Sequence, residues 1–292
     1  MPDLPTTFEP HNAGGKPPAS GAAGQGNDGA TSNLQKSEAL GGRTMKIWRG
    51  DAAGGEFKEY HAEVSAGMVV LDAVHQVQAT QAGDLACRWN CKAGKCGSCS
   101  AEINGLPRLM CMTRIESLPE GTITVQPMKA FKPMKDLVTD VSWNYAVKKK
   151  IAPFTPKAPE ADGTWRMQQF EVERVQEFRK CIECFLCQDT CHVLRDHGKH
   201  EEFAGPRFFV HSAQLEMHPL DTVNREAWLK NDGGLGYCNI TKCCTEVCPE
   251  HIHITDNAII PLKERVADTY YDPVIKLWRW AFKKFEQSEP KT

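Results

Sequence analysis

The 292-residue sequence lacks any apolar run that approaches the ~20 residues of a transmembrane helix. Its N-terminus lacks both the basic segment and the apolar segment of a secretory signal. Residues 1–42 contain no arginine and four acidic residues, which is atypical of a transit peptide. The net charge is only −2, and no arginine-rich stripe alternates with aromatic residues. We therefore expect no membrane span, no cleaved leader and no nucleic-acid partner.

Cysteine is absent from most of the chain, because all 13 cysteines fall within residues 87–111, 181–191 and 238–248. Their share is below that of a disulfide scaffold, and a chain of this length can build a core without covalent staples. The odd total and the repeated two-residue gaps favour metal ligation in a reducing compartment over disulfides. The cysteines therefore predict metal centres.

The length of the chain predicts about two domains of ~150 residues each. Residues 1–44 are rich in Gly, Ala, Ser and Asn and poor in large apolar residues, so we expect a disordered tail. Residues 45–130 carry short alternating runs and one helical pattern, which predicts a strand-rich domain with a helix. Strands are expected at 46–49, 57–64 and 123–125, and the helix at 69–80.

Beyond residue 130 the strand signal fades, and the pattern predicts an all-α domain over residues 131–270. Helices are expected at 136–149, 167–179, 207–217, 222–230 and 255–267, with a proline-rich loop at 151–163. Residues 271–292 predict an amphipathic C-terminal helix and tail. Tryptophans and basic residues between 276 and 285 leave two alternatives, packing on the helical domain or docking on a membrane surface or membrane-bound partner.

The first cysteine group has the spacing Cys91-x4-Cys96-x2-Cys99, with Cys111 further on. This is the plant-type ferredoxin pattern for a [2Fe–2S] cluster, with three ligands on a loop and the fourth on a following strand. Zinc is the alternative, but structural zinc sites usually take two ligands from each of two knuckles. Cys87 lies one helical turn before Cys91, and we interpret it as a small buried hydrophobic residue.

The other two groups are bacterial ferredoxin runs, Cys181-x2-Cys184-x2-Cys187-x3-Cys191 and Cys238-x5-Cys244-x3-Cys248-Pro249. In two-cluster ferredoxins the fourth cysteine of each run ligates the other cluster. This exchange predicts a [4Fe–4S] cluster and a [3Fe–4S] cluster. The ligands of the first would be Cys181, Cys184, Cys187 and Cys248, and those of the second Cys191, Cys238 and Cys244.

The second run has Thr241 where its second cysteine would stand. A hydroxyl is a poor iron ligand beside thiolates, so we expect the corner to be empty and the cluster to hold three irons. Cys243 offers an alternative, because its thiol could bind a fourth iron. We expect the same cysteines to bind all cluster iron, with no separate metal site.

The combination resembles the iron–sulfur subunit of succinate dehydrogenase and fumarate reductase, of a divergent bacterial type. The resemblance covers roughly residues 45–270. It is carried by Cys91-Lys-Ala-Gly-Lys-Cys96-Gly-Ser-Cys99, Asn104-Gly105 with Cys111, Cys181-Ile-Glu-Cys184-Phe-Leu-Cys187 and Cys244-Thr-Glu-Val-Cys248-Pro249. It implies an α+β chain, with an N-terminal β-grasp domain of the plant-type ferredoxin kind followed by an all-α two-cluster ferredoxin domain.

The resemblance also implies a function in the respiratory chain and the tricarboxylic acid cycle. A partner subunit would hold FAD and carry out the succinate–fumarate chemistry. The clusters would relay its electrons to a quinone, expected to be menaquinone, near the three-iron cluster. A membrane-anchor subunit would hold the chain on the cytoplasmic face of the bacterial plasma membrane. No residue of this chain would be catalytic.

One stretch departs from the family pattern around the quinone. The family usually has Pro, Ser and Trp after the fourth cysteine of the first run, where this chain has His192, Val193, Arg195 and Asp196, and Asn239 replaces a histidine. Either quinone binds through different contacts, or electrons pass to a further centre in the membrane partner. The departure suggests a haem-free bacterial branch.

Three other functions remain open from the sequence. Fumarate reduction would reverse the electron flow through the same motifs. A thiol-linked or heterodisulfide-type reductase is possible, although the single Cys243–Cys244 pair does not make the cysteine-rich domain of that class. A zinc-stabilised interaction module would be colourless, whereas a relay with ~9 irons would be brown.

Overall fold

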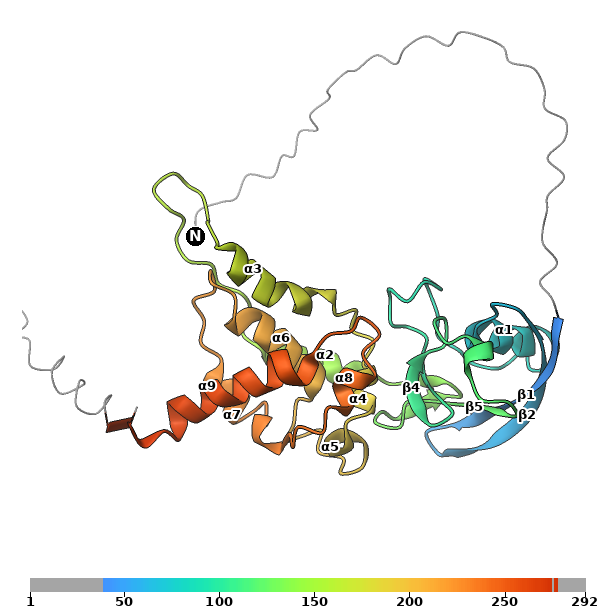
Figure 1. The fold of residues 1–292 in the computed structure, drawn as a ribbon. Helices are drawn as coiled ribbons and strands as arrows, with labels where there is room; N and C mark the ends of the chain where they lie inside the picture. Colours follow the sequence, from blue (N-terminus) through green and yellow to red (C-terminus); the bar gives the residue numbers. More distant parts are fainter. Residues whose placement is uncertain (1–38, 275, 278–292) are drawn as a thin grey trace, which may run out of the picture. The chain divides into compact units, whose positions relative to one another are not determined.

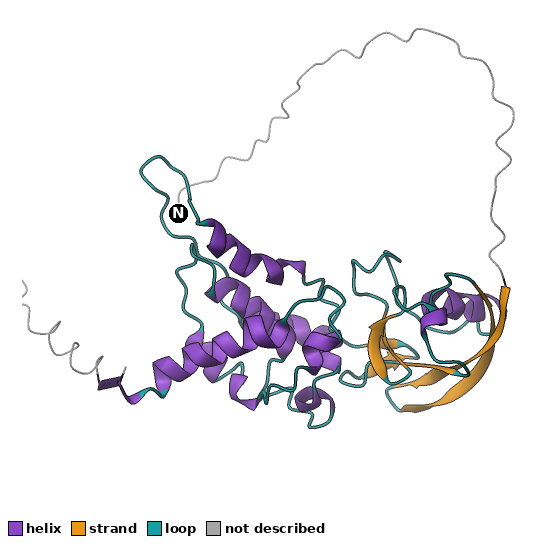
Figure 2. Cartoon of the chain, viewed as in Figure 1, coloured by secondary structure: helices purple, strands orange, loops and turns teal. Residues whose placement is uncertain are grey.

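The computed structural model describes residues 39–274 and 276–277, and Figures 1 and 2 show their helices and strands. The strands lie in the first part of the described chain, up to Thr139, and the long helices other than α1 lie in the second part. The predicted class, a β-grasp ferredoxin domain followed by a helical two-cluster domain, is therefore confirmed.

The N-terminal sheet has the strand order β4-β3-β5-β1-β6-β7, and β2 pairs with β1 along the whole length of β1. The central strand β1 pairs antiparallel with β2 and parallel with β5. Met45 and Ile47 of β1 are fully buried, and α1 packs on the sheet through its apolar face. The elements are β1 (Ala39–Asp51), β2 (Gly54–Ser65), α1 (Val70–Thr80), β3 (Ser100–Ile103), β4 (Leu106–Leu109), β5 (Ile123–Gln126), β6 (Pro133–Lys135) and β7 (Val138–Thr139).

The predicted disordered tail was too long at its C-terminal end. Residues 39–44 belong to β1, where Gly42 pairs with Glu63 and Arg43 with Ala62 of β2. Backbone pairing with a neighbouring strand therefore overrides a composition that favours disorder. Residues 1–38 lie outside the described part of the chain, as does most of the C-terminal helix and tail expected at 271–292.

The second half consists of short helices joined by ordered loops. They are α2 (Ser142–Lys150), α3 (Gln169–Gln176), α4 (Leu186–Asp189), α5 (His192–Arg195), α6 (Pro206–Glu216), α7 (Glu226–Lys230), α8 (Cys243–Glu246) and α9 (Ile260–Tyr270). 3-10 turns occur at Ile115–Ser117, Glu177–Lys180 and Leu235–Tyr237, and a π-helical segment, Ile254–Ile259, leads into α9. None of the helices in the described ranges has the length and apolar character needed to cross a bilayer.

Two predicted helices begin later than expected. The helix expected at 136–149 begins at Ser142, because residues 133–139 form β6 and β7 and extend the sheet past residue 130. Asp136 is also held by long-range bonds, since its carboxylate accepts from the backbone amides of Gly50 and Ala86. The helix expected at 222–230 begins at Glu226, because Thr222 is bonded to Thr155.

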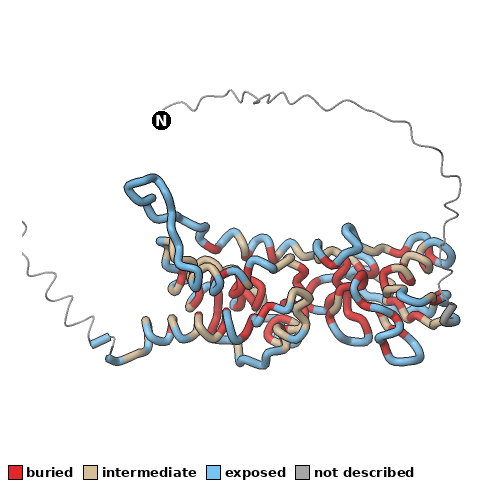
Figure 3. Tube along the Cα trace, turned by 45° about the horizontal axis from the view of Figure 1, so that its top comes forward, coloured by how far each residue is buried: buried red, intermediate tan, exposed pale blue. Residues whose placement is uncertain are grey.

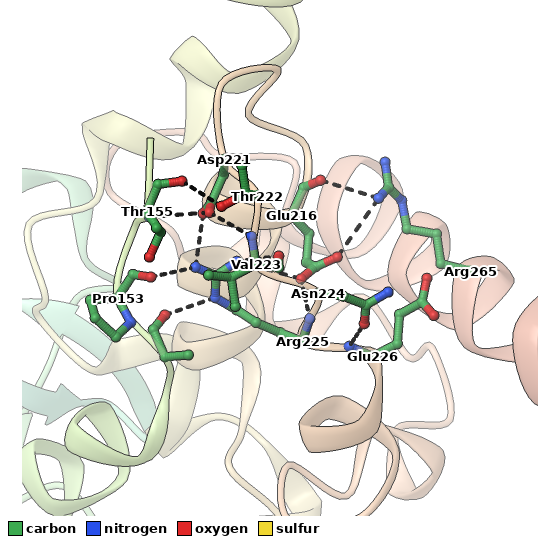
Figure 4. Close-up of polar contacts among 11 residues, drawn as sticks. Pro153, Thr155, Glu216, Asp221, Thr222, Val223, Asn224, Arg225, Glu226 and Arg265 are labelled. Atoms are coloured by element: carbon green, nitrogen blue, oxygen red, sulfur yellow. Dashed lines mark hydrogen bonds and ion pairs between the residues drawn. The ribbon is translucent and has the colours of Figure 1, made fainter. Parts of the chain in front are cut away.

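A buried ion-pair network fixes the start of the loop that precedes α3 (Figure 4). Arg225 is 1% exposed and pairs with Glu216 at 3.5 Å and Asp221 at 2.8 Å. It also donates to the carbonyl oxygens of Ala152 and Pro153, each at 2.8 Å. The remainder of this loop is exposed along its length (Figure 3). A charge this deeply buried is tolerated because its donors are paired.

Polar bonds connect the sheet to the helical part. Glu102 of β3 is fully buried and accepts two bonds from Arg195 of α5, at 2.6 and 3.2 Å. Asp189 of α4 accepts a hydrogen bond of 2.9 Å from the amide of Ala130. The first contact holds β3 to α5, and the second holds the segment around Ala130 to α4.

Candidate iron–sulfur sites

Cys91, Cys96 and Cys99 lie on the loop between α1 and β3, whereas Cys111 lies in the turn after β4 and not on a strand as expected. The backbone amides of Ala93 and Lys95 donate to the Sγ of Cys91, at 3.4 and 3.3 Å. The amide of Cys111 donates to the Sγ of Cys99 at 3.5 Å. The loop therefore turns its amides toward sulfur, which suits thiolates that carry negative charge.

The thiols of this group have contrasting environments. Burial opposes ionisation of Cys96, but hydrogen bonds from Ser98 and from backbone amides outweigh it and lower its pKa to about 7. Burial raises the pKa of Cys99 to about 12, and the neighbouring thiols of Cys111 and Cys96 add to the increase. These mutual effects place Cys96, Cys99 and Cys111 close together, as the spacing predicts.

The second group borders a cavity, which we call the second cavity. Its walls are apolar, with Ile182, Val210, Ile252 and Ile254 among them, and Arg207 also contributes. The four sulfurs predicted for the [4Fe–4S] cluster all line this cavity, from Cys181, Cys184, Cys187 and Cys248. The structure therefore brings the last cysteine of the second run to the first run, in the exchange that the spacing predicts.

Another cavity, which we call the third cavity because it belongs to the third site, is lined by the remaining cysteines. Cys191, Cys238 and Cys244 line it, together with Thr241 and Cys243. His192, Val193 and Asn239, three of the residues that depart from the family pattern, also line this cavity. Arg195 turns away to Glu102, and Asp196 is largely exposed.

The two runs have the same backbone conformation. Glu183 and Phe185 have positive φ angles of 55° and 62° in the first run, and Ile240 and Lys242 have 62° and 64° in the second. A positive φ is uncommon outside glycine and is costly for a β-branched residue such as Ile240. The match places Thr241 at the position of Cys184, so the missing ligand is a substitution within a preserved loop.

The donor chemistry of both cavities fits iron–sulfur clusters. Burial raises the pKa of Cys184 and Cys191 to about 12 and that of Cys244 to about 11. Burial also raises the pKa of Cys187 well above its ordinary value, with smaller contributions from the sulfurs around it. Buried thiolates need a bound cation to remain charged, and sulfur donors select soft metals such as cluster iron. Among the described residues, no set of three or more His, Cys, Asp or Glu is arranged around a single metal ion, and the sulfurs border cavities instead.

The three sites follow one another closely. A Cβ built on Gly97 would lie 2.6 Å from the Cα and 2.8 Å from the Cβ of Cys184, so the first cysteine loop touches the second. The Ser100 hydroxyl also bonds the Cys184 carbonyl oxygen at 2.9 Å. Cys187 and Cys191, which line different cavities, are separated by one turn of chain over α4.

Two features of the sites were not predicted from the sequence. The contact of Gly97 with Cys184 joins positions far apart in the chain. Arg207, 6% exposed, lines the second cavity and pairs with Glu183 at 2.5 Å. No local pattern signals either feature.

Cys87, which no proposed cluster uses, is half-buried. Its sulfur lies 3.9 Å from the carbonyl oxygen of Arg88, and burial raises the pKa of its thiol to about 12.

Two family models match the chain. Residues 44–145 match a 2Fe-2S iron-sulfur cluster binding domain, and residues 177–252 match a 4Fe-4S dicluster domain. The chain is also similar to a chain of the solved "Mycobacterium smegmatis Sdh1 complex in the apo form", at 61% identity and a TM-score of 0.77. That similarity covers 80% of this chain and 99% of the other.

Curated relatives show lower identity. The fumarate reductase iron-sulfur subunit of Mycobacterium tuberculosis is 28% identical over 67% of this chain and 80% of the relative. An uncharacterized iron-sulfur protein of Methanococcus maripaludis is 30% identical over 74% of this chain. The matched region spans only 42% of the length of that relative.

Proposed function

Because the chain belongs to the iron–sulfur subunits of succinate dehydrogenase and fumarate reductase, an oxidoreductase complex, we propose that its electron-transfer role is a three-station relay to quinone. Electrons would come from a partner subunit that holds FAD and carries the dicarboxylate chemistry. They would leave to a quinone, with menaquinone as our choice, beside a membrane-anchor subunit on the cytoplasmic face of a bacterial plasma membrane. Membership of the family establishes the electron-transfer role. The FAD-containing donor, the quinone and the membrane location are proposed.

We propose that the sulfurs at each station hold the clusters that their spacing predicts. Cluster iron supplies one-electron redox chemistry when bound. The proposed [2Fe–2S] ligands are Cys91, Cys96, Cys99 and Cys111, and the proposed [4Fe–4S] ligands are Cys181, Cys184, Cys187 and Cys248. The proposed [3Fe–4S] ligands are Cys191, Cys238 and Cys244. The chain's own residues orient the sulfurs, exclude water from the buried sites and donate amide hydrogen bonds to sulfur.

The observation that carries the relay is the contact of Gly97 with Cys184. Any side chain larger than that of glycine at position 97 would displace the main chain of Cys184. The first and second sites therefore approach as closely as two main chains allow. The α4 turn then links Cys187 of the second site to Cys191 of the third. Each transfer therefore has a short path through protein.

The exit side of the relay is the third cavity. His192 and Asn239 line it in place of the residues usual around the family's quinone. We propose that quinone is bound through these different contacts, or that electrons pass to a further centre in the anchor subunit. Reduced-minus-oxidised spectra of the purified complex would separate haem-containing from haem-free versions of that partner.

The proposal is tested on the native complex purified without oxygen. We expect a brown complex with ~9 irons per copy of this chain, from 2 + 4 + 3 by cluster type, and three cluster signals that succinate reduces. Cys191→Ser should leave the first cluster reducible by succinate and abolish quinone reduction, whereas Cys87→Ser should change neither. A colourless zinc protein, or quinone reduction by the Cys191→Ser complex at the wild-type rate, would refute the relay.

Fumarate reduction is the second candidate direction. It is favoured by the curated relative from Mycobacterium tuberculosis, which is named a fumarate reductase iron-sulfur subunit. Cluster potentials depend on hydrogen bonds to sulfur and on exposure, so the same ligands serve either direction. Rates of succinate oxidation and of fumarate reduction by one preparation would decide between them.

A further inference from the structure

The third cavity contains one more thiol than the proposed three-iron cluster requires. Cys243 lines it beside Cys191, Cys238 and Cys244. The equivalent position of the first run is Leu186, which is buried but does not line the second cavity. Cys243 therefore faces its cavity, although its counterpart in the matching loop does not.

The contacts of Cys243 place its sulfur among the proposed ligands. The Sγ of Cys243 lies 3.3 Å from the hydroxyl of Thr241, the residue at the missing ligand position. Burial is the main cause of the raised pKa of Cys191, and the nearby thiols of Cys243 and Cys244 both add to it. The sulfur of Cys243 thus lies beside the missing ligand position, in the cavity that a ligand from the other run also lines.

The chain before Cys243 contains two residues with positive φ angles, as the first run does before Leu186. Lys242, with φ +64°, precedes α8, and Cys243 is the first residue of that helix. Ile240, two residues earlier, also has a positive φ. Such conformations are costly for side chains that carry a Cβ and tend to persist at functional sites.

We propose that Cys243 is a conditional fourth ligand, which lets the third site take up a fourth iron. The inference rests on the proposed function and on the three ligands already assigned to this site. In the three-iron state the Cys243 sulfur stays beside the Thr241 hydroxyl. When ferrous iron is present and the site is reduced, the Cys243 thiolate binds the added iron.

The step balances in atoms and charge. A reduced three-iron cluster of core charge 0 and one Fe²⁺ give a four-iron cluster of core charge +2, with no further electron needed. The reducing electron comes from the relay itself. The proton of the Cys243 thiol leaves to solvent, which the half-buried position of this residue allows. Because potential depends on cluster type, the relay would then respond to the supply of ferrous iron.

The experiment uses the intact complex with the full chain, kept free of oxygen. The sample is reduced, incubated with ferrous ammonium sulfate, desalted and mildly reoxidised. We expect the wild type to rise from ~9 to ~10 irons per chain and to lose the EPR signal of the oxidised three-iron cluster. Cys243→Ser should stay at ~9 irons and keep that signal.

Cys87→Ser is the matched control, because it removes the one cysteine that no cluster group uses, and it should behave as the wild type. The [2Fe–2S] signal of each sample reports whether the chain is folded. Failure of the wild type to take up iron would overturn the inference, as would equal uptake by Cys243→Ser. Loss of the three-iron signal from untreated Cys243→Ser would overturn it too, because Cys243 would then be an obligatory ligand. In each of these cases the relay itself would still stand, since it fails only if the three clusters are absent or do not conduct.

Discussion

Replacing Gly97 with alanine should weaken the contact between the first two sites. A Cβ there would lie 2.6 Å from the Cα of Cys184, whereas carbon atoms pack best at 3.5–4.0 Å, so the Cys184 main chain must retreat by about 1 Å. Gly97 also has φ +67°, where alanine costs about 1–2 kcal/mol. Overpacking adds about 1–3 kcal/mol. We expect Gly97→Ala to destabilise the chain by roughly 2–5 kcal/mol and to slow electron transfer from the first cluster to the second.

Two other glycines allow the cost of the positive φ angle to be separated from the cost of overpacking. Gly105 has φ +78° and no atom within 4 Å of an added Cβ, so Gly105→Ala should show the backbone cost alone. Gly94 also has φ +67°, but its added Cβ would meet the flexible side chain of Met112, which can move aside. Both variants should conduct electrons at the wild-type rate.

The assay combines thermal unfolding of the complex with rapid-freeze EPR after succinate is added. In Gly97→Ala the first cluster should become reduced at the normal rate and the second more slowly. If Gly97→Ala matches Gly105→Ala in both stability and the lag between clusters, the argument from close approach is wrong.

Three further predictions concern the rest of the molecule. Arg225→Met should cost about 3–5 kcal/mol in denaturant unfolding, because it strands two buried carboxylates, whereas Arg265→Met, at a half-exposed position, should cost under ~1 kcal/mol. Burial lowers the pKa of His211 to about 4, so stability should fall as the pH drops from 6.5 to 4. Between pH 6.5 and pH 4, the His211→Gln variant should lose roughly 2 kcal/mol less stability than the wild type, a value reduced because the side chain is partly exposed. In the cluster-free chain at pH 8, iodoacetamide should label Cys96, with a pKa of about 7, well before Cys184, with a pKa of about 12, as peptide mass spectrometry would show.

Each of these has an outcome that contradicts it. A mild effect of Arg225→Met would mean that water replaces the guanidinium. An unchanged acid transition in His211→Gln would assign that transition to other groups. Equal labelling of both cysteines would mean that the cluster-free chain opens its buried sites to solvent.

The cysteine pattern was the most informative part of the sequence. Ligand spacing within a run reflects local turns, so Cys181, Cys184 and Cys187 predicted a shared site that the structure places around one cavity. The exchange of Cys191 and Cys248 was also predictable, because it follows from the pairing of two runs. Their assignment as cluster ligands remains a prediction.

Long-range contacts were beyond the reach of the sequence. Residues 39–44 have the composition of a disordered tail and become a strand only because residues 61–65 pair with them. The residues after Asp136 have a helical pattern. However, the Asp136 carboxylate accepts hydrogen bonds from two amides far away in the sequence, and the chain forms the β6–β7 hairpin there instead. Neither partner lies close enough in the chain to leave a local signal.

The second cavity closes only when Cys248 reaches Cys181, Cys184 and Cys187, and this has a consequence for biosynthesis. A nascent chain on the ribosome can present all four sulfurs of the first site once residue 111 has emerged from the exit tunnel. The other two stations each wait for sulfurs from both runs, so neither can be filled until the second run has also emerged. A chain truncated just before residue 248 should therefore lose the second site while keeping the first.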